Sequence, residues 1–363
     1  MRLSRLLDWR WWFGLRPKFA IEPPVAKYSI TIVVPAYNEE DSIGATISNL
    51  KLQTVPIEEI IVVDDCSSDG TGEISREMGV TVIRTHKNQG SKAMAQNYVI
   101  PQIVSDLIVT IDADTILAPD AIEKTLPWFN SPKTASVCGF VIPQKVETLW
   151  ERGRFIEYVF GISLHKRAQQ NIGLVMVSSG CFSVFRTELL KMMGGFDART
   201  MAEDMDLTWN FLLEGYEIYC EQTAYCYPFD PPTLKIFVNQ IDRWYRSFFQ
   251  NVSVHSFRKN KGLGIMIYGY LLEPALAPIL AVAFLTTMKW NFWWLIMLAA
   301  AIDLTIVAIP CLIKGAVTGM TGKVLTSLPA YWVIRFVNIY VFWRSFWREW
   351  IIKDKLNSWN KGH

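Results

Sequence analysis

Short runs of Ile and Val alternate with amphipathic segments over the first two thirds of the chain. The runs lie within residues 28–40, 58–65, 80–86 and 105–117, and helical spacing of apolar residues marks segments such as Ser42 to Leu50 between them. Continuous β-branched runs separated by such helices are typical of a mostly parallel sheet that is covered on both faces. We therefore predict an α/β domain over residues 28–230, with ligands bound beyond the carboxyl ends of its strands.

The longest apolar stretches lie in the C-terminal third. Residues 263–288, 292–313 and 324–343 each contain a single charged residue, respectively Glu273, Asp303 and Arg335. About 20 apolar residues suffice for a helix to cross a bilayer, so we predict membrane helices within 262–352, with buried core helices as the alternative. A charged residue in a membrane helix is unfavourable unless it is paired or faces a polar cavity. We therefore predict that these three residues line a polymer path or pair with one another. The alternative is a purely structural buried ion pair that holds the helices together.

Three other segments mix basic and apolar residues. Residues 1–27 contain no apolar run of spanning length, and we predict an amphipathic segment on an anionic membrane surface, with a disordered basic tail as the alternative. Residues 231–261 place aromatic residues beside Arg and Lys at helical spacing, which predicts interfacial helices. Residues 353–363 are expected to form a basic tail.

Composition and charge narrow the class of protein. Hydrophobic residues make up 51% of the 363 residues and charged ones 19%, below the ~25% usual in soluble domains. The 36 Lys and Arg against 34 Asp and Glu leave a net charge of +2, which gives no support for a nucleic-acid partner. The 6 Cys form no CxxC pair, so we predict reduced thiols instead of a disulfide framework or a zinc site.

Carboxylates stand at the ends of two predicted strands. Asp64 and Asp65 end the run IIVVDD, and Asp112 and Asp114 form a D-x-D after LIVTI. Two hard oxygen ligands at the ligand-binding edge suit Mg²⁺ or Mn²⁺ with a diphosphate completing the coordination shell. A D-x-D alone is a weak signal, because solvated Asp residues are also common in loops.

Two further constellations have a structural and a chemical interpretation. Glu203, Asp204 and Asp206 lie near the predicted start of a helix, where acids complement the helix dipole, but a carboxylate there could also act as a general base. Residues 240–244, QIDRW, place an Arg suited to phosphate beside a Trp on which a sugar ring can stack. The alternative for 240–244 is an aromatic belt residue beside a snorkelling Arg.

Taken in order, these motifs resemble those of the family 2 glycosyltransferases. The resemblance is to their membrane-integrated processive branch, which includes the cellulose, hyaluronan and poly-N-acetylglucosamine synthases. It implies a GT-A type catalytic domain, a mostly parallel sheet flanked by helices, followed by interfacial and membrane helices. The motifs that carry it are VVPAYNEE, VVDDCSSDGT, KNQGSKAMAQN, DAD, SSGCFSVFR, AEDMDLTW and QIDRW.

The resemblance also implies roles for individual residues. Asp204 matches the catalytic base and Glu203 the acid beside it in a motif usually written T-E-D, where this chain has Ala202 in place of Thr. Asp112 and Asp114 match the Mg²⁺ or Mn²⁺ motif, with Asp114 as the direct ligand. The nucleotide-sugar contacts match Pro35, Ala36, Tyr37, Glu39, Asp64, Asp65, Lys92, Asp112 and Arg243. The acceptor contacts match Ser179, Gly180, Cys181, Gln240 and Trp244.

These matches predict an inverting and processive transferase that extends a β-linked polysaccharide from a UDP-sugar, with UDP-GlcNAc favoured. The first alternative is transfer of a single sugar to polyprenyl or dolichyl phosphate, in enzymes that usually lack Q-x-x-R-W. The second is a catalytically silent membrane subunit, which the presence of Asp114 and Asp204 disfavours. UDP-sugars are cytosolic, so we expect an integral plasma-membrane protein with a cytosolic catalytic domain. With about three spans, a complete polymer channel would need a small membrane subunit or a second copy.

Overall fold

An eight-stranded sheet forms the centre of the first two thirds of the protein. The computed structural model describes residues 27–288, 293–354 and 356. The strand order across the sheet is β3-β2-β1-β4-β7-β6-β8-β5. The strands are β1 (Ile30–Ala36), β2 (Glu59–Asp64), β3 (Thr81–Arg84), β4 (Leu107–Ile111), β5 (Ile116–Leu117), β6 (Thr134–Val141), β7 (Phe182–Arg186) and β8 (Glu217–Tyr227).

The predicted α/β fold is confirmed, but the sheet is mixed. Strands β3, β2, β1 and β4 run parallel, and β6 is parallel to β8. Strand β7 is antiparallel to both of its neighbours, β4 and β6, and the short edge strand β5 is antiparallel to β8. Strand order reverses between β1 and β4, so the carboxyl ends of these two strands border the crevice where such sheets bind ligands.

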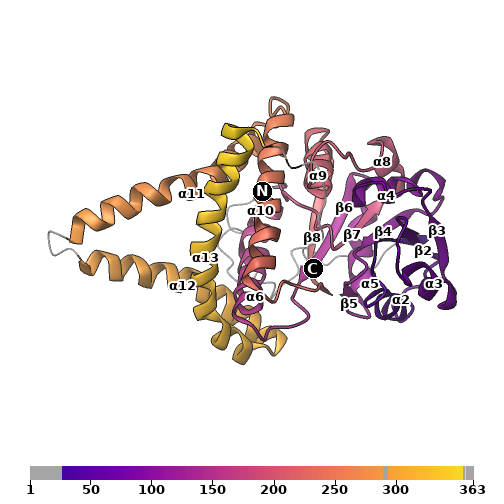
Figure 1. The fold of residues 1–363 in the computed structure, drawn as a ribbon, viewed down its shortest axis with the longest axis horizontal. Helices are drawn as coiled ribbons and strands as arrows, with labels where there is room; N and C mark the ends of the chain where they lie inside the picture. Colours follow the sequence, from indigo (N-terminus) through magenta and orange to yellow (C-terminus); the bar gives the residue numbers. More distant parts are fainter. Residues whose placement is uncertain (1–26, 289–292, 355, 357–363) are drawn as a thin grey trace.

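Helices cover both faces of the sheet and form the C-terminal third (Figure 1). The shorter ones are α2 (Ile43–Leu50), α3 (Thr71–Glu77), α4 (Lys92–Asn97), η2 (Ile100–Gln102), α5 (Ala121–Thr125), η3 (Leu126–Asn130), α7 (Arg167–Asn171) and α8 (Thr187–Met192). The longer or irregular ones are α6 (Leu149–Phe160), η4 (Gly161–Lys166), α9 (Glu203–Leu213), α10 (Leu234–Val254), α11 (Lys261–Met288), α12 (Trp293–Thr318), α13 (Thr321–Phe346) and η5 (Trp347–Ile352).

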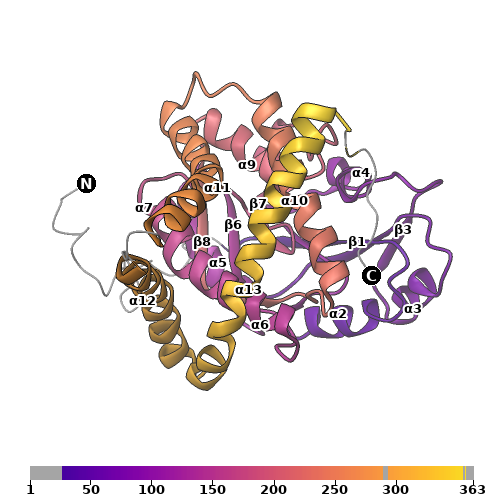
Figure 2. The same ribbon diagram turned by 60° about the vertical axis from the view of Figure 1, so that its left-hand side comes forward.

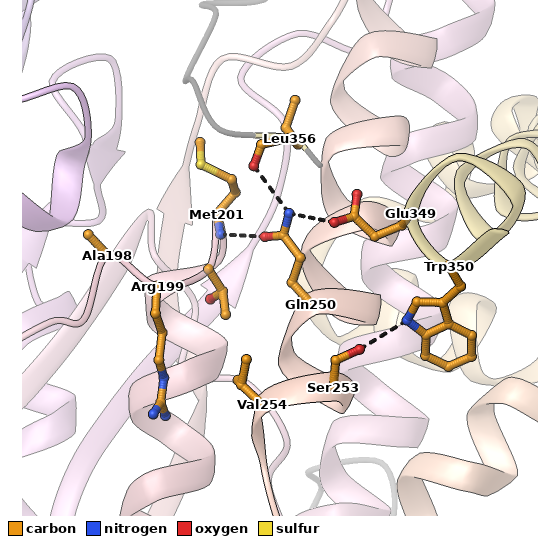
Figure 3. Close-up of a pocket in the computed structure, with 10 residues that line it drawn as sticks. Ala198, Arg199, Met201, Gln250, Ser253, Val254, Glu349, Trp350 and Leu356 are labelled. Carbon is orange, nitrogen blue, oxygen red and sulfur yellow. Dashed lines mark hydrogen bonds between the residues drawn. The ribbon is translucent and has the colours of Figure 1, made fainter. Parts of the chain in front are cut away.

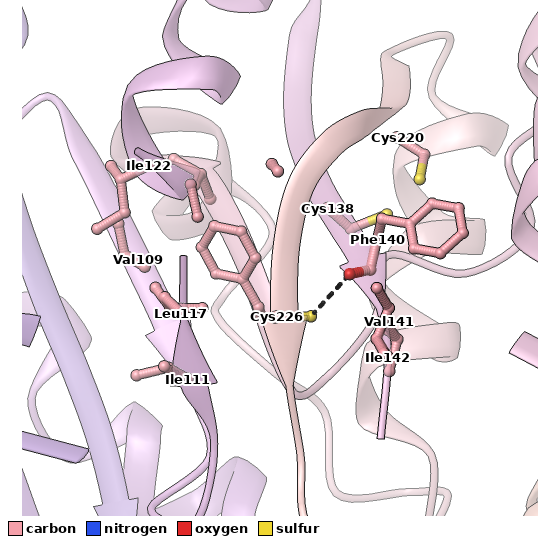
Figure 4. Packing of buried hydrophobic residues seen from close by; sticks show 14 of the residues in the cluster. Val109, Ile111, Leu117, Ile122, Cys138, Phe140, Val141, Ile142, Cys220 and Cys226 are labelled. Atoms are coloured by element: carbon pink, nitrogen blue, oxygen red, sulfur yellow. Dashed lines mark hydrogen bonds between the residues drawn. The ribbon is translucent and has the colours of Figure 1, made fainter. Parts of the chain in front are cut away.

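Two hydrophobic cores lie on opposite faces of the sheet. Ile32 and Val34 of β1 pack into one core and the intervening Val33 packs into the other, which is why this strand is apolar throughout. Figure 4 shows part of the first core, where the Cys226 thiol of β8 is 3.6 Å from the carbonyl oxygen of Phe140 in β6. The uninterrupted Ile and Val runs of the sequence therefore reflect burial on both faces.

The C-terminal helices extend away from the sheet. Figures 1 and 2 show α11 and α12 projecting from the α/β domain, while α13 crosses beside α10. Among the described residues, two segments are long and apolar enough to cross a membrane, Met297–Thr318 and Thr321–Ile352. They overlap the spans predicted at 292–313 and 324–343 but extend further at their C-terminal ends. The span predicted at 263–288 lies within α11, some of whose side chains are outside the described set, and it stays a prediction.

Two of the three charged residues predicted in the spans meet each other. The Arg335 guanidinium of α13 lies 2.5 Å from the Asp303 carboxylate of α12, and the Trp332 indole N–H donates to the other oxygen of Asp303 at 3.0 Å. Both charged side chains are about one third exposed within the chain (35% and 33%). The Glu273 side chain and the segments 1–26 and 357–363 lie outside the described residues.

Helix α10 joins the sheet domain to the C-terminal helices. Residues 231–261 were predicted as interfacial helices, and most of this segment forms the single helix α10, capped by the Thr233 side chain, which accepts from the Ile236 N–H at 3.4 Å. Its buried face includes Phe249, whose ring centroid is 5.3 Å from that of Phe342 in α13. Position at a membrane interface stays a prediction.

Candidate active site

The D-x-D residues lie at the reversal point of the sheet. Asp112 directly follows β4, and its backbone N–H donates to the carbonyl oxygen of Cys181 at 3.3 Å. That bond extends the antiparallel β4–β7 pairing by one residue, since Ile111 pairs with Phe182. The strand that carries the D-x-D is thereby joined to the segment 179–181, which the sequence placed in the acceptor site.

Like charges gather around Asp114. Burial and, after it, the negative charges of Asp112 and Glu39 together raise the pKa of Asp114 to about 7. Gln144 holds the backbone of Asp114 by donating its side-chain N–H to the Asp114 carbonyl oxygen at 2.7 Å. Within the described residues, no three His, Cys, Asp or Glu side chains form a metal site by themselves. The two carboxylates of Asp112 and Asp114 are hard oxygen donors of the kind that a divalent cation prefers, and their role as its ligands stays a prediction.

Lys92 links the D-x-D to the acceptor segment. It is the first residue of α4, and its ammonium contacts the Asp112 carboxylate and donates to the carbonyl oxygen of Gly180 at 2.6 Å. Burial alone would lower the pKa of Lys92, but the charges of Asp112, Glu203 and Asp204 outweigh it and raise the pKa. The sequence predicted Lys92 beside the nucleotide; the structure surrounds it with three carboxylates.

Asp204 lies next to the same glycine. Its Oδ2 accepts the backbone N–H of Gly180 at 2.9 Å, and its Oδ1 accepts the N–H of Met205 at 2.8 Å in the first turn of α9. A Cβ at position 180 would lie 3.0 Å from that Oδ2, so glycine permits the close approach. Burial raises the pKa of Asp204, and burial followed by the Asp204 charge raises that of Glu203 to about 7. A carboxylate with a raised pKa is a stronger general base at neutral pH.

The third acid of this cluster has a different environment. Asp206 is fully buried, 2.8 Å from the Arg199 guanidinium and 3.1 Å from Nε2 of His255. These contacts tie the beginning of α9 to the segment that follows α10. A structural role at a helix start, the alternative for the whole cluster, therefore fits Asp206, while the role of Asp204 as a general base stays a prediction.

Asp64 and Asp65 are buried and engaged by their own surroundings. Asp64 accepts the N–H of Ser67 at 2.8 Å and contacts the Arg84 guanidinium. The two oxygens of Asp65 accept the N–H of Gln89 at 2.9 and 3.1 Å. These bonds shape the loops that follow β2 and β3.

The other residues predicted for nucleotide contact lie at the end of β1. Pro35 and Ala36 are the last two residues of that strand, and Tyr37, 37% exposed, follows them. Glu39 comes next and lies near Asp114, as its effect on the pKa of that carboxyl shows. The whole nucleotide set except Arg243 therefore lies along the carboxyl edge of the parallel strands, while its binding role stays a prediction.

The α10 motif meets a buried cation that sequence reasoning missed. Arg154 of α6 is fully buried, donates to the Gln240 side chain at 2.8 Å and lies 4.6 Å from the Trp244 ring centroid. It also contacts Glu157 and lies 3.6 Å from the Asp230 carboxylate. An Arg followed three residues later by a Glu is common on exposed helix faces, so the sequence contained no signal of this role. Arg154 fixes two of the three motif side chains.

Arg243 exerts an electrostatic effect on Glu203. Its positive charge is one of the influences that lower the pKa of Glu203 against the effect of burial. Gln240 and Trp244 of the same helix contact Arg154. Trp244 remains 38% exposed, which leaves part of its ring face open.

A second missed cation supports the acceptor segment. The Lys166 ammonium, at the end of η4, donates to the Ser179 hydroxyl at 2.8 Å and lies 3.5 Å from the Cys138 sulfur. Cys181, two residues after Ser179, has its sulfur 4.0 Å from that of Cys226. Ser179, Gly180 and Cys181 are thus each held by a different neighbour.

Comparison with known proteins agrees with this geometry. Residues 31–194 match the family model described as glycosyl transferase family 2. The match covers the strands β1 to β7 and the D-x-D, and it ends before Asp204. The mixed sheet and its flanking helices form a GT-A-like fold.

Several similar curated proteins are synthases of one name. The chain is 33% identical over 220 residues to a poly-beta-1,6-N-acetyl-D-glucosamine synthase of Staphylococcus aureus, covering 59% of this chain and 53% of that protein. It is 31% identical over 220 residues to the synthase of the same name from Staphylococcus epidermidis, with the same coverage. The aligned region thus spans about half the length of these relatives.

A solved structure shares the fold over most of the chain. A mannosyltransferase from Pyrobaculum calidifontis, determined with GDP-Man and Mn²⁺, aligns with a TM-score of 0.63 and 20% identity. The alignment covers 90% of this chain and 94% of that one. At this identity the likeness establishes a common fold, which includes the helices that follow the sheet domain.

Proposed function

We propose that this protein is an inverting, processive glycosyltransferase that extends a β-linked polysaccharide from a UDP-sugar, with UDP-GlcNAc as the donor. One observation carries the proposal. Lys92 connects Asp112 of the D-x-D to Gly180, and Gly180 donates to Asp204, so donor-side and acceptor-side carboxylates belong to one site. The similarity to poly-beta-1,6-N-acetyl-D-glucosamine synthases supports the choice of donor and polymer.

Asp112 and Asp114 are the residues that would hold Mg²⁺ or Mn²⁺. The fit is supported by the raised pKa of Asp114, about 7, which reflects burial and negative neighbours that a cation would neutralise. Such a metal, when bound, offsets charge that develops on the diphosphate leaving group. The Mn²⁺ in the structure of the related fold supports the same class of ion.

The chain's own groups account for the rest of the reaction. The acceptor hydroxyl attacks the anomeric carbon, the bond from that carbon to the diphosphate oxygen breaks, and the acceptor proton passes to Asp204. A direct displacement of this kind inverts an α-linked donor sugar into a β-linked product. Arg243, whose charge acts on Glu203, supplies positive charge near the leaving group, since a guanidinium binds phosphate oxygens in a bidentate manner.

Trp244 and Gln240 are proposed to hold the acceptor sugar. The partly exposed Trp244 ring offers a flat face for a pyranose. The Arg154 guanidinium, 4.6 Å from the ring centroid, fixes the orientation of this ring. A fixed stacking platform favours retention of the product between additions, which is what processive synthesis requires. The Ser179 to Cys181 segment contacts Asp204 through the Gly180 N–H and is proposed to complete the acceptor site.

We further propose that the catalytic domain is cytosolic and that the protein resides in the plasma membrane. Two apolar helices among the described residues support membrane insertion. Cytosolic UDP-sugars require the site to face the cytosol. A path for the polymer across the bilayer would need more helices than these, which supports a small membrane subunit or a second copy of the chain as partner.

The proposal is tested with purified protein in nanodiscs. Radiolabelled UDP-GlcNAc, UDP-glucose, UDP-glucuronate and GDP-mannose are supplied with Mg²⁺ or Mn²⁺, each with and without polyprenyl phosphate. Products are separated by size and by solvent extraction, and Asp204→Asn serves as the control. We expect high-mass, water-soluble label from UDP-GlcNAc that the control lacks. Label that enters only the organic phase, and only with polyprenyl phosphate, would assign single-sugar transfer instead.

A further inference from the structure

The segment that leads into Asp204 is held by the C-terminal end of the protein (Figure 3). The Met201 backbone N–H donates to the side-chain oxygen of Gln250 in α10 at 3.1 Å. The amide nitrogen of Gln250 donates in turn to Oε1 of Glu349 at 2.9 Å and to the carbonyl oxygen of Leu356 at 3.2 Å. A continuous chain of hydrogen bonds thus joins η5 to a backbone position three residues before Asp204.

The next residue of α10 holds the same segment. Asn251 is fully buried, and its amide nitrogen lies 3.3 Å from the carbonyl oxygen of Ala202 and 3.2 Å from the Thr200 hydroxyl. Ala202 is the residue immediately before α9, so its carbonyl sets the start of the helix. The position of α10 therefore dictates where the first turn of α9, with Glu203 and Asp204, is located.

Glu349 is in turn fixed by a buried ion pair. Its Oε2 lies 3.0 Å from Nε of Arg246, and their side chains are only 3% and 2% exposed. Arg246 also donates to the backbone carbonyl of Asp354. Because Arg246, Gln250 and Asn251 share α10, the C-terminal segment and the start of α9 are attached to the same two turns of one helix.

A cavity beside these contacts leaves the segment room to move. It has a volume of about 220 Å³ and is lined by residues of three elements, including Met201, Gln250 and Glu349. Close packing would hold the segment even without the hydrogen bonds, but a cavity does not. The hydrogen bonds are therefore what fixes residues 200–202.

We propose that Glu349 is a positioning residue for glycosyl transfer, acting through Gln250 on the backbone that leads into Asp204. The inference rests on the proposed role of Asp204 as the base. Since η5 continues α13, the placement of the base is coupled to the C-terminal membrane helix. The carboxylates Asp112 and Asp114 stand on β4 and the loop after it, whereas Glu349 and Gln250 stand on η5 and α10, so donor binding is expected to change less than kcat.

Three variants of the full chain in nanodiscs test the proposal. Glu349→Ala removes the acceptor for Gln250, Glu349→Gln retains an oxygen at the same place, and Gln250→Met breaks the link while keeping the Arg246–Glu349 pair. Arg348→Gln is the matched control, because Arg348 pairs with Asp242 at 3.2 Å and Asp354 at 2.7 Å without contacting Gln250. Hydrogen exchange of residues 200–206 and the kcat and KM for UDP-GlcNAc are measured for each.

We expect Glu349→Ala and Gln250→Met to lower kcat about tenfold with a smaller change in KM, since small displacements of a catalytic group have effects of this order. Both should speed exchange at 200–206. Glu349→Gln keeps an oxygen for Gln250 but removes the charge beside the buried Arg246, so it should lie between Glu349→Ala and the parent, whereas Arg348→Gln should match the parent in both readouts. If Gln250→Met folds with parent exchange at 200–206, or retains parent kcat, the proposal is overturned. Exchange requires no turnover, so a parent protein that makes no polymer would refute the proposed function without deciding this inference.

Discussion

Two regions of this protein gather charge, and they do so in opposite ways. At the carboxyl edge of the sheet, Asp112, Asp114 and Glu39 lie together, and the pKa of Asp114 is raised to about 7 by burial and its negative neighbours. At the junction of α6, α10 and α13, by contrast, each buried guanidinium meets carboxylates: Arg154 contacts Glu157, and Arg246 lies 3.0 Å from Glu349.

The contrast separates a ligand site from a scaffold. Lys92 pairs with Asp112 but does not offset the burial and the negative neighbours that raise the pKa of Asp114, so we expect a bound cation to complete this cluster. Paired charges need no ligand, and losing one partner leaves the other buried and uncompensated. Substitution of a charged residue should therefore reduce activity in the first region and stability in the second.

The largest expected effect lies in the first region. Asp204→Asn removes the proton acceptor while keeping the size of the side chain, so kcat should fall about a thousandfold, within the range for general bases. The melting temperature should stay the same or rise, because burial disfavours the charge on Asp204. Steady-state transfer and thermal unfolding provide the two readouts. A variant that keeps more than a tenth of the parent kcat would exclude Asp204 as the base.

The second region should respond in stability. Arg154→Met leaves Glu157 and Asp230 without their guanidinium, and removal of one partner of a buried pair costs about 3 kcal/mol or more. Thermal unfolding in nanodiscs measures the loss. The matched control is Lys259→Met, because Lys259 and Glu214 form a pair that is 65% and 50% exposed, where about 0.5 kcal/mol is expected. Equal losses in the two variants would contradict the contrast.

A smaller effect links the first region to pH. A carboxyl whose pKa is raised to about 7 in the folded state keeps its proton over the range from about 4 to 7 where the unfolded chain has lost it. Its contribution to stability is therefore present below pH 4 and is lost as pH rises through 7. A divalent cation binds the deprotonated form and should compensate that loss.

We accordingly expect Mn²⁺ to raise the melting temperature more at pH 7.5 than at pH 5.5, with the change centred near pH 7. Differential scanning fluorimetry at fixed Mn²⁺ follows it directly. In Asp114→Asn the pH dependence of this gain should disappear, and the metal-free protein should be more stable by about 1 kcal/mol. A gain that is independent of pH in the parent would argue against Asp114 as a ligand.

The smallest effect concerns the ion pair between α12 and α13. Asp303→Asn keeps an oxygen that can accept from Trp332 but weakens the contact with Arg335, and polar contacts between membrane helices contribute about 0.6 kcal/mol on average. Product length, measured by size-exclusion chromatography, should not change. Shorter products from a normally folded variant would instead favour a polymer path along this pair.

The sequence predicted the part of the site that lies directly at strand ends, and it did not predict contacts that depend on the order of strands in the sheet. Asp112 and Asp114 could be placed because the carboxyl ends of parallel strands share one edge. The meeting of Lys92 with Gly180 and Asp204 could not, since it depends on β7 inserting antiparallel beside β4. Which strand neighbours which is a property of the whole sheet, and short apolar runs do not encode it.

Buried charge was the other feature that the sequence concealed. Arg154 and Glu157 are spaced like an exposed helical pair, and only the packing of α6 against α10 encloses them. Arg246 and Glu349 are likewise enclosed only by packing between elements, because they lie 103 residues apart in sequence. Hydrophobic pattern predicts which face of a helix is buried when that face is apolar, and it fails when the buried face carries paired charges.

The antiparallel pairing of β7 with β4 fixes the position of the residues that precede β7. Ile111 pairs with Phe182, so the residues after β4 and those before β7 face each other position by position. Residues 179–182 form a turn in which the Phe182 N–H donates to the Ser179 carbonyl oxygen at 3.2 Å, and deleting one residue between Ser178 and Cys181 would break it. The backbone of Gly180 would then lose its hydrogen bonds with both Lys92 and Asp204. A change of one residue in this turn should therefore separate the residues that contact Asp112 from those that contact Asp204.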